Sequence, residues 1–354
     1  MDRLYAITGA TSHLGQTIIQ NLIDDKQKIR CLIHKTTLSS SLRSYPIEIV
    51  EGSINEMDAL RELVDYPGEV VLIHLAERKE FAEEITELMF QTNINGTQNV
   101  LDVCFEKRVS RLVYLSTIDV LRRPESLKLL KEVQYYRAEG VRGGYGKSKA
   151  VATQMVLDAG KMGLNVTVFL PSHLIGPQDY RKGLTSRMIL DFLENKIKYT
   201  IDGGFDVVDV RDVASAILKA IEISRPQEVY LTTGQYITIT DFLAEISRLT
   251  RRKKVQTKLP KVVVENSMEL LGRVGKLLRF KSRLSNPYFV DMFQSSARFT
   301  SNKAIKELRF ESRPLSISIR DAISFFIEKE MITTPINLRK NIKTEIEEDL
   351  GRED

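Results

Sequence analysis

The segment Thr8-Gly-Ala-Thr-Ser-His-Leu-Gly15 stands between a short apolar run, Arg3–Thr8, and a stretch that starts at Leu14 and repeats its apolar residues at helical spacing. A glycine-containing turn between a strand and a helix is the context in which a glycine fingerprint binds a dinucleotide. Gly9 permits the tight turn, Gly15 permits close packing of the helix on the strand, and the free N–H groups of the helix N-terminus can hold a pyrophosphate. A tight turn without a ligand is the alternative that this segment alone leaves open.

Strands and helices alternate along the chain after this turn. Apolar runs predict four more strands at Lys28–His34, Ile47–Val50, Val70–Ala76 and Val109–Ser116, with helical patterns between them. The alternation continues with a helix over Tyr145–Lys161, strands at Val166–Leu170 and Phe205–Val210, and a helix over Val213–Ile223. Such alternation implies parallel strands joined by right-handed crossovers, and hence an α/β fold with a doubly wound Rossmann sheet.

The sequence pattern changes near residue 227. We expect a Rossmann domain that carries the catalytic residues (1–226), a smaller C-terminal substrate lobe that interleaves with it (227–334) and a charged tail (335–354). In the lobe, Thr238 and Asp241 are typical of an N-cap pair for a helix over Phe242–Leu249. The last residues are rich in Lys, Glu and Asp, which predicts a mobile or weakly helical tail.

Composition excludes several classes of protein. A chain of 354 residues with 42% hydrophobic and 28% charged residues can bury a globular core. Its net charge of +5 comes without a basic block interleaved with aromatics, so nucleic-acid binding is only a weak alternative. No apolar run reaches transmembrane length, and the strand at the start leaves no room for a signal peptide, so we expect a cytoplasmic protein without stable membrane insertion. Cys31 and Cys104 lie in apolar runs, which predicts buried thiols and no metal site.

The end of the second predicted strand, Ile33-His34-Lys35-Thr36, bears on the choice of dinucleotide. An Asp or Glu about twenty positions after the glycines would hydrogen-bond the ribose 2′-hydroxyl of NAD. Neither is present here, and the cation at Lys35 can pair with a 2′-phosphate. We therefore expect His34 and Lys35 to favour NADP over NAD, with a solvated surface lysine as the alternative.

Tyr145-Gly-Lys-Ser-Lys149 places a phenol and an ammonium four residues apart, on one face of a helix. A tyrosine of ordinary pKa, about 10, is a poor acid–base catalyst at neutral pH, and we expect the ammonium to lower that pKa. Tyr145 can then give a proton to a carbonyl oxygen as hydride arrives, or take one from an alcohol as hydride leaves. Thr117, with Ser116 as the neighbouring candidate, ends the fifth strand at the carboxyl edge of the sheet, where open α/β folds bind ligands. An ordinary surface pair is the alternative to this catalytic interpretation.

Taken in order, these motifs resemble the extended short-chain dehydrogenase/reductase family, also called the NAD-dependent epimerase/dehydratase family. The resemblance covers about residues 3–330. The matching segments are Thr8–Gly15, His74-Leu-Ala76, Asn93-Ile-Asn-Gly-Thr97, Tyr114-Leu-Ser-Thr117, Tyr145–Lys149, Pro171-Ser-His-Leu-Ile-Gly-Pro177 and Val208-Asp-Val-Arg-Asp-Val213.

The resemblance implies an NAD(P)-dependent enzyme with Thr117, Tyr145 and Lys149 as catalytic residues and Ser116 beside them. It also implies that Asn93 supports the ends of the fourth and fifth strands. The cofactor contacts that follow from the matched motifs are Gly9, Thr11, Ser12, His13, Leu14, Gly15, His34, Lys35, Ser53, Ile54, Leu75, Ala76, Asn93, Tyr145, Lys149, Pro171, His173 and Leu174.

Three positions depart from the family's pattern. Ser12 stands where the middle glycine of the loop is expected, and a serine fits there if its φ is negative. Ser53 replaces an Asp that usually contacts the adenine, and Glu77 follows Ala76 where a small residue is common. We therefore expect adenine binding to be the weak point of the cofactor site.

Two further segments indicate the branch of the family. Thr117-Ile-Asp119 lacks the central acid of the family's dehydratases, which argues against dehydration and leaves Asp119 as a candidate substrate contact. Phe169-Leu-Pro-Ser172 is closer to reductases that resemble dihydroflavonol reductase and 3β-hydroxysteroid dehydrogenase than to nucleotide-sugar epimerases. We therefore expect an oxidoreductase that reduces a carbonyl or oxidises a secondary alcohol on a small organic substrate. A nucleotide-sugar epimerase and a non-catalytic NAD(P)-sensing protein are the alternatives, and a homodimer is compatible with the sequence.

The segment Met268–Leu284 combines apolar residues at helical spacing with a basic flank. A basic amphipathic helix can lie on an anionic membrane surface. Such a pattern is more often the buried face of a helix in a globular lobe. We therefore expect Met268–Leu284 to be a lobe helix and not a membrane-surface helix.

Overall fold

The computed structural model describes residues 2–34, 42, 44–123, 129–255, 257–259 and 297–332. The expectations placed on Lys35, on Met268–Leu284 and on the tail over 335–354 fall outside these residues.

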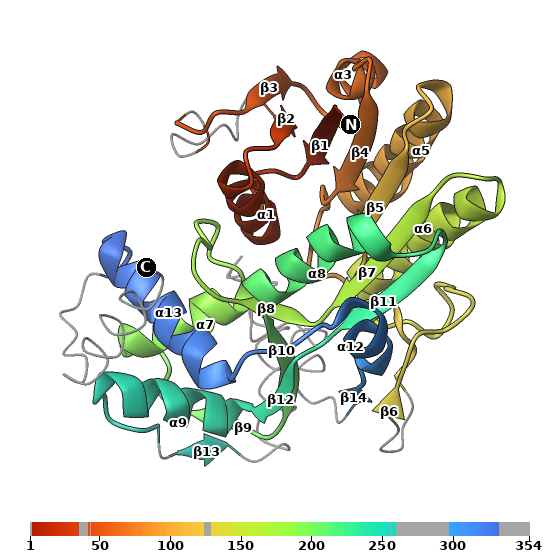
Figure 1. Cartoon of the computed structure of the whole chain (residues 1–354). Helices are drawn as coiled ribbons and strands as arrows, with labels where there is room; N and C mark the ends of the chain where they lie inside the picture. The colour runs from red at the N-terminus through yellow and green to blue at the C-terminus, as the bar shows by residue number, and fades with distance from the viewer. Residues whose placement is uncertain are drawn as a thin grey trace.

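A seven-stranded parallel sheet forms the centre of the chain (Figure 1). Its strands are β1 (Arg3–Thr8), β2 (Lys28–Ile33), β3 (Glu48–Glu51), β4 (Glu69–His74), β5 (Arg111–Leu115), β7 (Val166–Pro171) and β11 (Glu228–Thr232). The order across the sheet is β11-β7-β5-β4-β1-β2-β3. The chain reverses its direction across the sheet between β1 and β4, which makes their carboxyl ends the switch point where doubly wound sheets bind ligands. The predicted Rossmann architecture is confirmed.

Helices cover both faces of this sheet, so successive strand residues enter different cores. Within β4, for example, Leu72 belongs to the core on one face and Ile73 to the core on the other. The first core is closed by α3 (Met57–Val64), α5 (Gly96–Glu106) and α6 (Gly143–Lys161), and the second by α1 (His13–Asp24), α8 (Val210–Ile223) and α12 (Asn302–Leu308). Burial on both faces explains why these strands read as continuous apolar runs.

A smaller lobe begins at the carboxyl edge of the sheet (Figure 1). Its first strand, β8, starts at His173, shortly after β7 of the large sheet ends at Pro171. Its three-stranded sheet has the order β12-β10-β8, and α7, α9 and α13 close a third core against it. The bounds are β8 (His173–Ile175), β10 (Gly204–Asp209), β12 (Gln235–Thr238), α7 (Leu184–Leu193), α9 (Ile239–Thr250) and α13 (Leu315–Glu328). Four short strands form two further pairs, β9 (Thr200–Ile201) with β13 (Lys258–Leu259) and β6 (Leu129–Leu130) with β14 (Arg298–Phe299).

Two strands differ from the expected alternation. The strand predicted at Phe205–Val210 is present as β10, but it pairs with β8 and β12 in the small sheet. Its place at the edge of the large sheet is taken by β11, which the sequence pattern did not predict. The first residues of α9 follow the expected cap, because the Thr238 hydroxyl accepts a hydrogen bond of 3.0 Å from the Asp241 N–H.

The predictions of buried thiols hold in the structure, where Cys31 and Cys104 are both buried and unpaired. Over the described ranges, no helix combines the length and the apolar character needed to cross a membrane. The same ranges contain no group of three or more His, Cys, Asp or Glu side chains placed to hold a metal ion.

Candidate active site

The glycine loop approaches the end of β4 so closely that side chains are excluded from it. Gly9 has a φ of +73°, and a Cβ at this position would lie 2.5 Å from the carbonyl carbon of Leu75. A Cβ on Gly15 would lie 2.6 Å from the carbonyl oxygen of Gly9. Both positions therefore require glycine: Gly9 for its backbone conformation and both for space.

Ser12 adopts the negative φ that a serine needs in this loop, with a value of −74°. Its hydroxyl accepts a hydrogen bond of 3.0 Å from the Gly15 N–H and so caps α1. This bond uses one of the free N–H groups of the helix end. A pyrophosphate bound here has correspondingly fewer backbone donors.

The loop that follows β8 lies against the glycine loop. The imidazole Nε2 of His13 is 2.7 Å from the carbonyl oxygen of Pro177, and the guanidinium of Arg181 donates to the Thr11 hydroxyl. Arg181 is exposed, so its charge is available beside the end of α1. Sequence reasoning missed this residue, since Arg181 is far from the loop in sequence and belongs to no motif.

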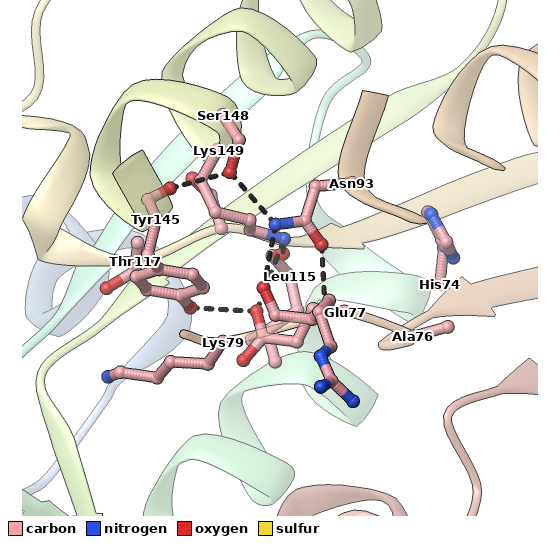
Figure 2. A network of polar contacts seen from close by, with 12 residues as sticks. His74, Ala76, Glu77, Lys79, Asn93, Leu115, Thr117, Tyr145, Ser148 and Lys149 are labelled. Atoms are coloured by element: carbon pink, nitrogen blue, oxygen red, sulfur yellow. Dashed lines mark hydrogen bonds and ion pairs between the residues drawn. The ribbon is translucent and has the colours of Figure 1, made fainter. Parts of the chain in front are cut away.

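Tyr145 and Lys149 lie in the first turns of α6, next to the segment after β4 and the end of β5 (Figure 2). Tyr145 and Lys149 are buried, with 3% and 2% of their surfaces exposed. The Lys149 ammonium donates to the carbonyl oxygen of Leu115 at 2.6 Å. A Cβ on Gly146 would meet the carbonyl oxygen of Asp119 at 2.7 Å, so glycine lets α6 approach the segment after β5.

Glu77, from the segment after β4, contacts both Tyr145 and Lys149. The Tyr145 hydroxyl donates to Glu77 Oε2 at 2.8 Å, and the Lys149 ammonium lies 3.4 Å from the same oxygen (Figure 2). One oxygen of Glu77 therefore contacts both Tyr145 and Lys149. The expectation that this departure weakens adenine binding stays a prediction. The sequence signal for this contact was that Glu77 stands where the family usually has a small residue.

The charge of Glu77 changes the expected acidity of the phenol. Burial and the Glu77 carboxylate raise the pKa of Tyr145 well above its ordinary value. The expectation that Lys149 would lower the pKa of Tyr145 is therefore wrong, because burial and the Glu77 carboxylate next to both groups outweigh the ammonium. Burial acts to lower the pKa of Lys149, but Tyr114 and Glu77 outweigh it and raise that pKa, so the ammonium stays charged.

The two candidate hydroxyls after β5 point to different places. Ser116 is 2.6 Å from the Thr153 hydroxyl and is fully engaged in the packing of α6 on β5. The Thr117 hydroxyl accepts from the Asp119 N–H at 3.2 Å, and Thr117 is drawn in the same close-up as Tyr145 (Figure 2). Ser116 is thus engaged with α6, whereas Thr117 caps the turn that follows β5.

A charged cluster borders the other side of Tyr145. Asp119 is buried and receives a hydrogen bond of 2.8 Å from Arg123, and its second oxygen lies 4.0 Å from the Lys79 ammonium. Lys79 also lies 4.7 Å from the centre of the Tyr145 ring. Burial acts to raise the pKa of Asp119, but Lys79 and Arg123 lower it, so Asp119 is ionised. Burial and Lys79 lower the pKa of the neighbouring His173 to about 4.

Two buried polar residues, His74 and Asn93, connect the segments that surround the site. His74 lies 2.6 Å from the Thr8 hydroxyl and 3.2 Å from the Thr97 hydroxyl, which ties β4 to β1 and α5. Asn93 bonds both backbone groups of Arg78, at 2.7 and 2.9 Å, and the Ser148 hydroxyl at 2.9 Å. Asn93 therefore joins the segment after β4 to α6, whereas the resemblance implied support of the β4 and β5 ends.

The remaining candidates lie along the same edge of the sheet. His34 is exposed at the end of β2, and the Ser53 hydroxyl, after β3, accepts from the Asn55 N–H at 3.2 Å. Leu14, Ile54, Leu75 and Pro171 are buried, and Ala76 and Leu174 are partly buried. The ends of β1, β4, β5 and β7 thus bring the glycine loop, Ala76, Thr117 and Pro171 to one edge.

Comparison with known proteins agrees with this arrangement. Residues 5–231 match the NAD dependent epimerase/dehydratase family. The chain is similar to sterol demethylase protein B of Methylococcus capsulatus, with 26% identity over 92% of this chain and 99% of that protein. It is similar to a putative dihydroflavonol 4-reductase of Synechocystis, with 24% identity over 92% of this chain and 95% of that protein. In fold it resembles the crystal structure of a nucleoside-diphosphate-sugar epimerase from Pseudomonas aeruginosa, with a TM-score of 0.75 and 18% identity over 94% of this chain and all of the other.

Proposed function

Because the chain belongs to the NAD-dependent epimerase/dehydratase family, we propose that it is an NAD(P)-dependent oxidoreductase that interconverts a carbonyl and a secondary alcohol with Tyr145 as general acid and base. The observation that carries this proposal is the grouping of Tyr145, Lys149 and Thr117 at the switch point of the sheet, next to the glycine loop. A structural ion pair on a helix surface would not be buried there.

The site's own residues fit a dinucleotide. Gly9 lets the loop pack closely on the end of β4, and the end of α1 and Arg181 offer N–H groups and a cation to a pyrophosphate. Lys149 is placed to hold ribose hydroxyls. When bound, the dinucleotide supplies or accepts the hydride.

Proton transfer falls to the residues around Tyr145. In reduction, the phenol gives its proton to the substrate oxygen, and the Lys149 ammonium stabilises the phenolate that remains. The Thr117 hydroxyl donates a second hydrogen bond to the same oxygen. Because burial keeps water away from Tyr145, these electrostatic effects act in a medium of low polarity.

Two relatives suggest the class of substrate. One is named for sterol demethylation and the other for dihydroflavonol reduction, which both point to a ring system of low polarity. We propose an apolar cyclic ketone or alcohol, with the Asp119 cluster as the contact for a polar substituent. For the cofactor we propose NADP, because His34 and Lys35 replace the acidic residue that NAD requires.

The test is NADPH consumption with a panel of cyclic ketones, wild type against Tyr145→Phe. We expect Tyr145→Phe to lower turnover on the order of 10²-fold or more while dinucleotide affinity stays close to wild type, because only the proton donor is lost. Tyr135→Phe, at an exposed tyrosine, is the matched control. Undiminished turnover of Tyr145→Phe would refute the mechanism, and substrate conversion without net loss of NADPH would indicate an epimerase.

Titration with both dinucleotides tests the cofactor. We expect NADPH to bind more tightly than NADH and Lys35→Asp to remove the difference, because the new carboxylate repels a 2′-phosphate. Equal affinities in the wild type would contradict the role proposed for Lys35.

A further inference from the structure

One carboxylate oxygen contacts both Tyr145 and Lys149. Glu77 Oε2 accepts the hydrogen bond of the Tyr145 phenol at 2.8 Å and lies 3.4 Å from the Lys149 ammonium (Figure 2). The phenol has a single O–H group, so it cannot donate to any other oxygen while this bond exists. The Lys149 ammonium makes its remaining contacts with the Leu115 carbonyl and the face of the Tyr114 ring.

The proposed chemistry needs the same position. A substrate oxygen must accept the Tyr145 proton, and a ribose hydroxyl held by Lys149 must approach its ammonium. Each ligand would bring an oxygen to one of the two groups that Glu77 Oε2 contacts, and the phenol can give its one proton to only one oxygen at a time. Glu77 must therefore move away when a dinucleotide and substrate engage the pair.

The surroundings of Glu77 allow its side chain to move away from Tyr145 and Lys149. Its side chain is 27% exposed, so water can receive the carboxylate. The neighbouring cations are already paired, Arg78 with Glu80 at 2.7 Å and Lys79 more loosely with Asp119 at 4.0 Å. Only the contacts with Tyr145 and Lys149 are found for the Glu77 side chain among the described residues, so a rotation of this side chain disturbs no other ion pair there.

We infer that Glu77 is a positioning residue that occupies the ligand oxygen's place between Tyr145 and Lys149 and that dinucleotide binding displaces it. The inference rests on the proposed function, since it takes the Tyr145–Lys149 pair as the site that the dinucleotide engages. At its observed position, Glu77 neutralises the buried ammonium and favours the protonated phenol. Its displacement lowers the affinity for the dinucleotide, and it removes the negative charge nearest to the phenol as the site fills.

The first test measures dinucleotide binding to the full chain. NADPH binding is monitored by fluorescence titration, and NADP⁺ binding is monitored by its competition with NADPH. Glu77→Gln keeps the shape and removes the charge, and Glu77→Ala also empties the space. We expect both variants to bind about tenfold more tightly than wild type, equivalent to about 1.4 kcal/mol. Glu80→Gln is the matched control: it removes a carboxylate of the same segment that pairs with Arg78 and touches neither catalytic side chain. We expect its affinity to equal that of the wild type.

The second test uses no ligand. The absorbance of tyrosinate is measured as the pH is raised. For the wild type and for each variant, the titration of the same protein carrying Tyr145→Phe is subtracted, and the difference is the ionisation of Tyr145. The charged or titratable groups facing this phenol are Glu77 and Lys79 after β4, Tyr114 on β5, Asp119 after β5 and Lys149 on its own helix. Glu77→Gln removes the nearest negative charge, so Tyr145 is expected to ionise at a lower pH, whereas Glu80→Gln leaves its titration unchanged.

The outcomes separate this inference from the proposed function. Unchanged or weaker dinucleotide binding by Glu77→Gln, with the wild type still binding, overturns the inference alone. An unchanged titration of Tyr145 in Glu77→Gln overturns it as well, because the carboxylate would then not engage the phenol. If the wild type and every variant fail to bind a dinucleotide, the proposed function and the inference are both wrong.

Discussion

Replacement of Gly9 by alanine tests how the glycine loop is built. The substitution meets two obstacles in the structure. Its φ of +73° lies in the left-handed region, and its new Cβ would stand 2.5 to 2.7 Å from the backbone atoms of Leu75 and Ala76. Neither neighbour is the flexible end of a side chain, so the end of β4 itself has to move.

The magnitude follows from comparing two glycines. Gly163 also has a positive φ, of +106°, but a Cβ there would meet nothing within 4 Å. Gly163→Ala therefore carries only backbone strain of about 1–2 kcal/mol, partly offset by the reduced entropy of the unfolded chain. Gly9→Ala adds overpacking of about 1–3 kcal/mol. Movement of β4 also weakens the 3.1 Å bond from the Leu75 N–H to the Thr8 carbonyl, a loss of about 1 kcal/mol. We expect about 4 kcal/mol of destabilisation for Gly9→Ala against about 1 kcal/mol for Gly163→Ala.

Urea unfolding of both variants measures this difference, and NADPH titration measures its effect on the site. We expect Gly9→Ala to lose more than about tenfold in affinity, because movement of the loop displaces the N–H groups at the start of α1 that would hold a pyrophosphate. Gly163→Ala lies in the turn after α6 and should bind as the wild type does. If the two variants unfold within about 1 kcal/mol of each other and both retain affinity, the close approach at Gly9 does not govern either property.

Three further predictions concern the hydroxyls and the buried histidine. Thr117→Ala is expected to lower turnover about tenfold or more with little loss of stability. Ser116→Ala breaks only the side-chain bond to Thr153, so it is expected to lower stability by about 1 kcal/mol and leave turnover near wild type. The reverse pattern in kinetics and urea unfolding would exchange the roles of the two hydroxyls. Burial lowers the pKa of His74 to about 3, so between about pH 6.5 and pH 3 the unfolded chain takes up a proton that the folded chain does not, and stability falls as pH falls. His74→Asn is expected to reduce this slope by up to about 1.4 kcal/mol per pH unit below pH 6.5, and an unchanged slope in unfolding at pH 6 and pH 5 would show that His74 titrates normally.

The sequence by itself determined the features that depend on local spacing. Apolar runs bounded by turn residues identified the strands β1 to β5 and β7, because strands buried on both faces need continuous apolar segments. The spacing of Tyr145 and Lys149 placed them on one helical face, and the segment Thr8–Gly15 indicated the turn that opens α1. Each of these properties is written within a few consecutive residues.

Contacts between residues that are far apart in the sequence depend on the tertiary fold. Glu77 reaches Tyr145 across 68 positions of sequence because β4 and β5 are neighbours and α6 returns beneath their ends. Arg181 reaches Thr11 across 170 positions through the loop after β8. The pKa of Tyr145 lies well above its ordinary value because tertiary packing buries the phenol and places the Glu77 carboxylate, from another strand end, beside it. Local periodicity fixes the direction of a side chain relative to its own strand or helix, whereas the charges that surround it depend on the order in which strands pair.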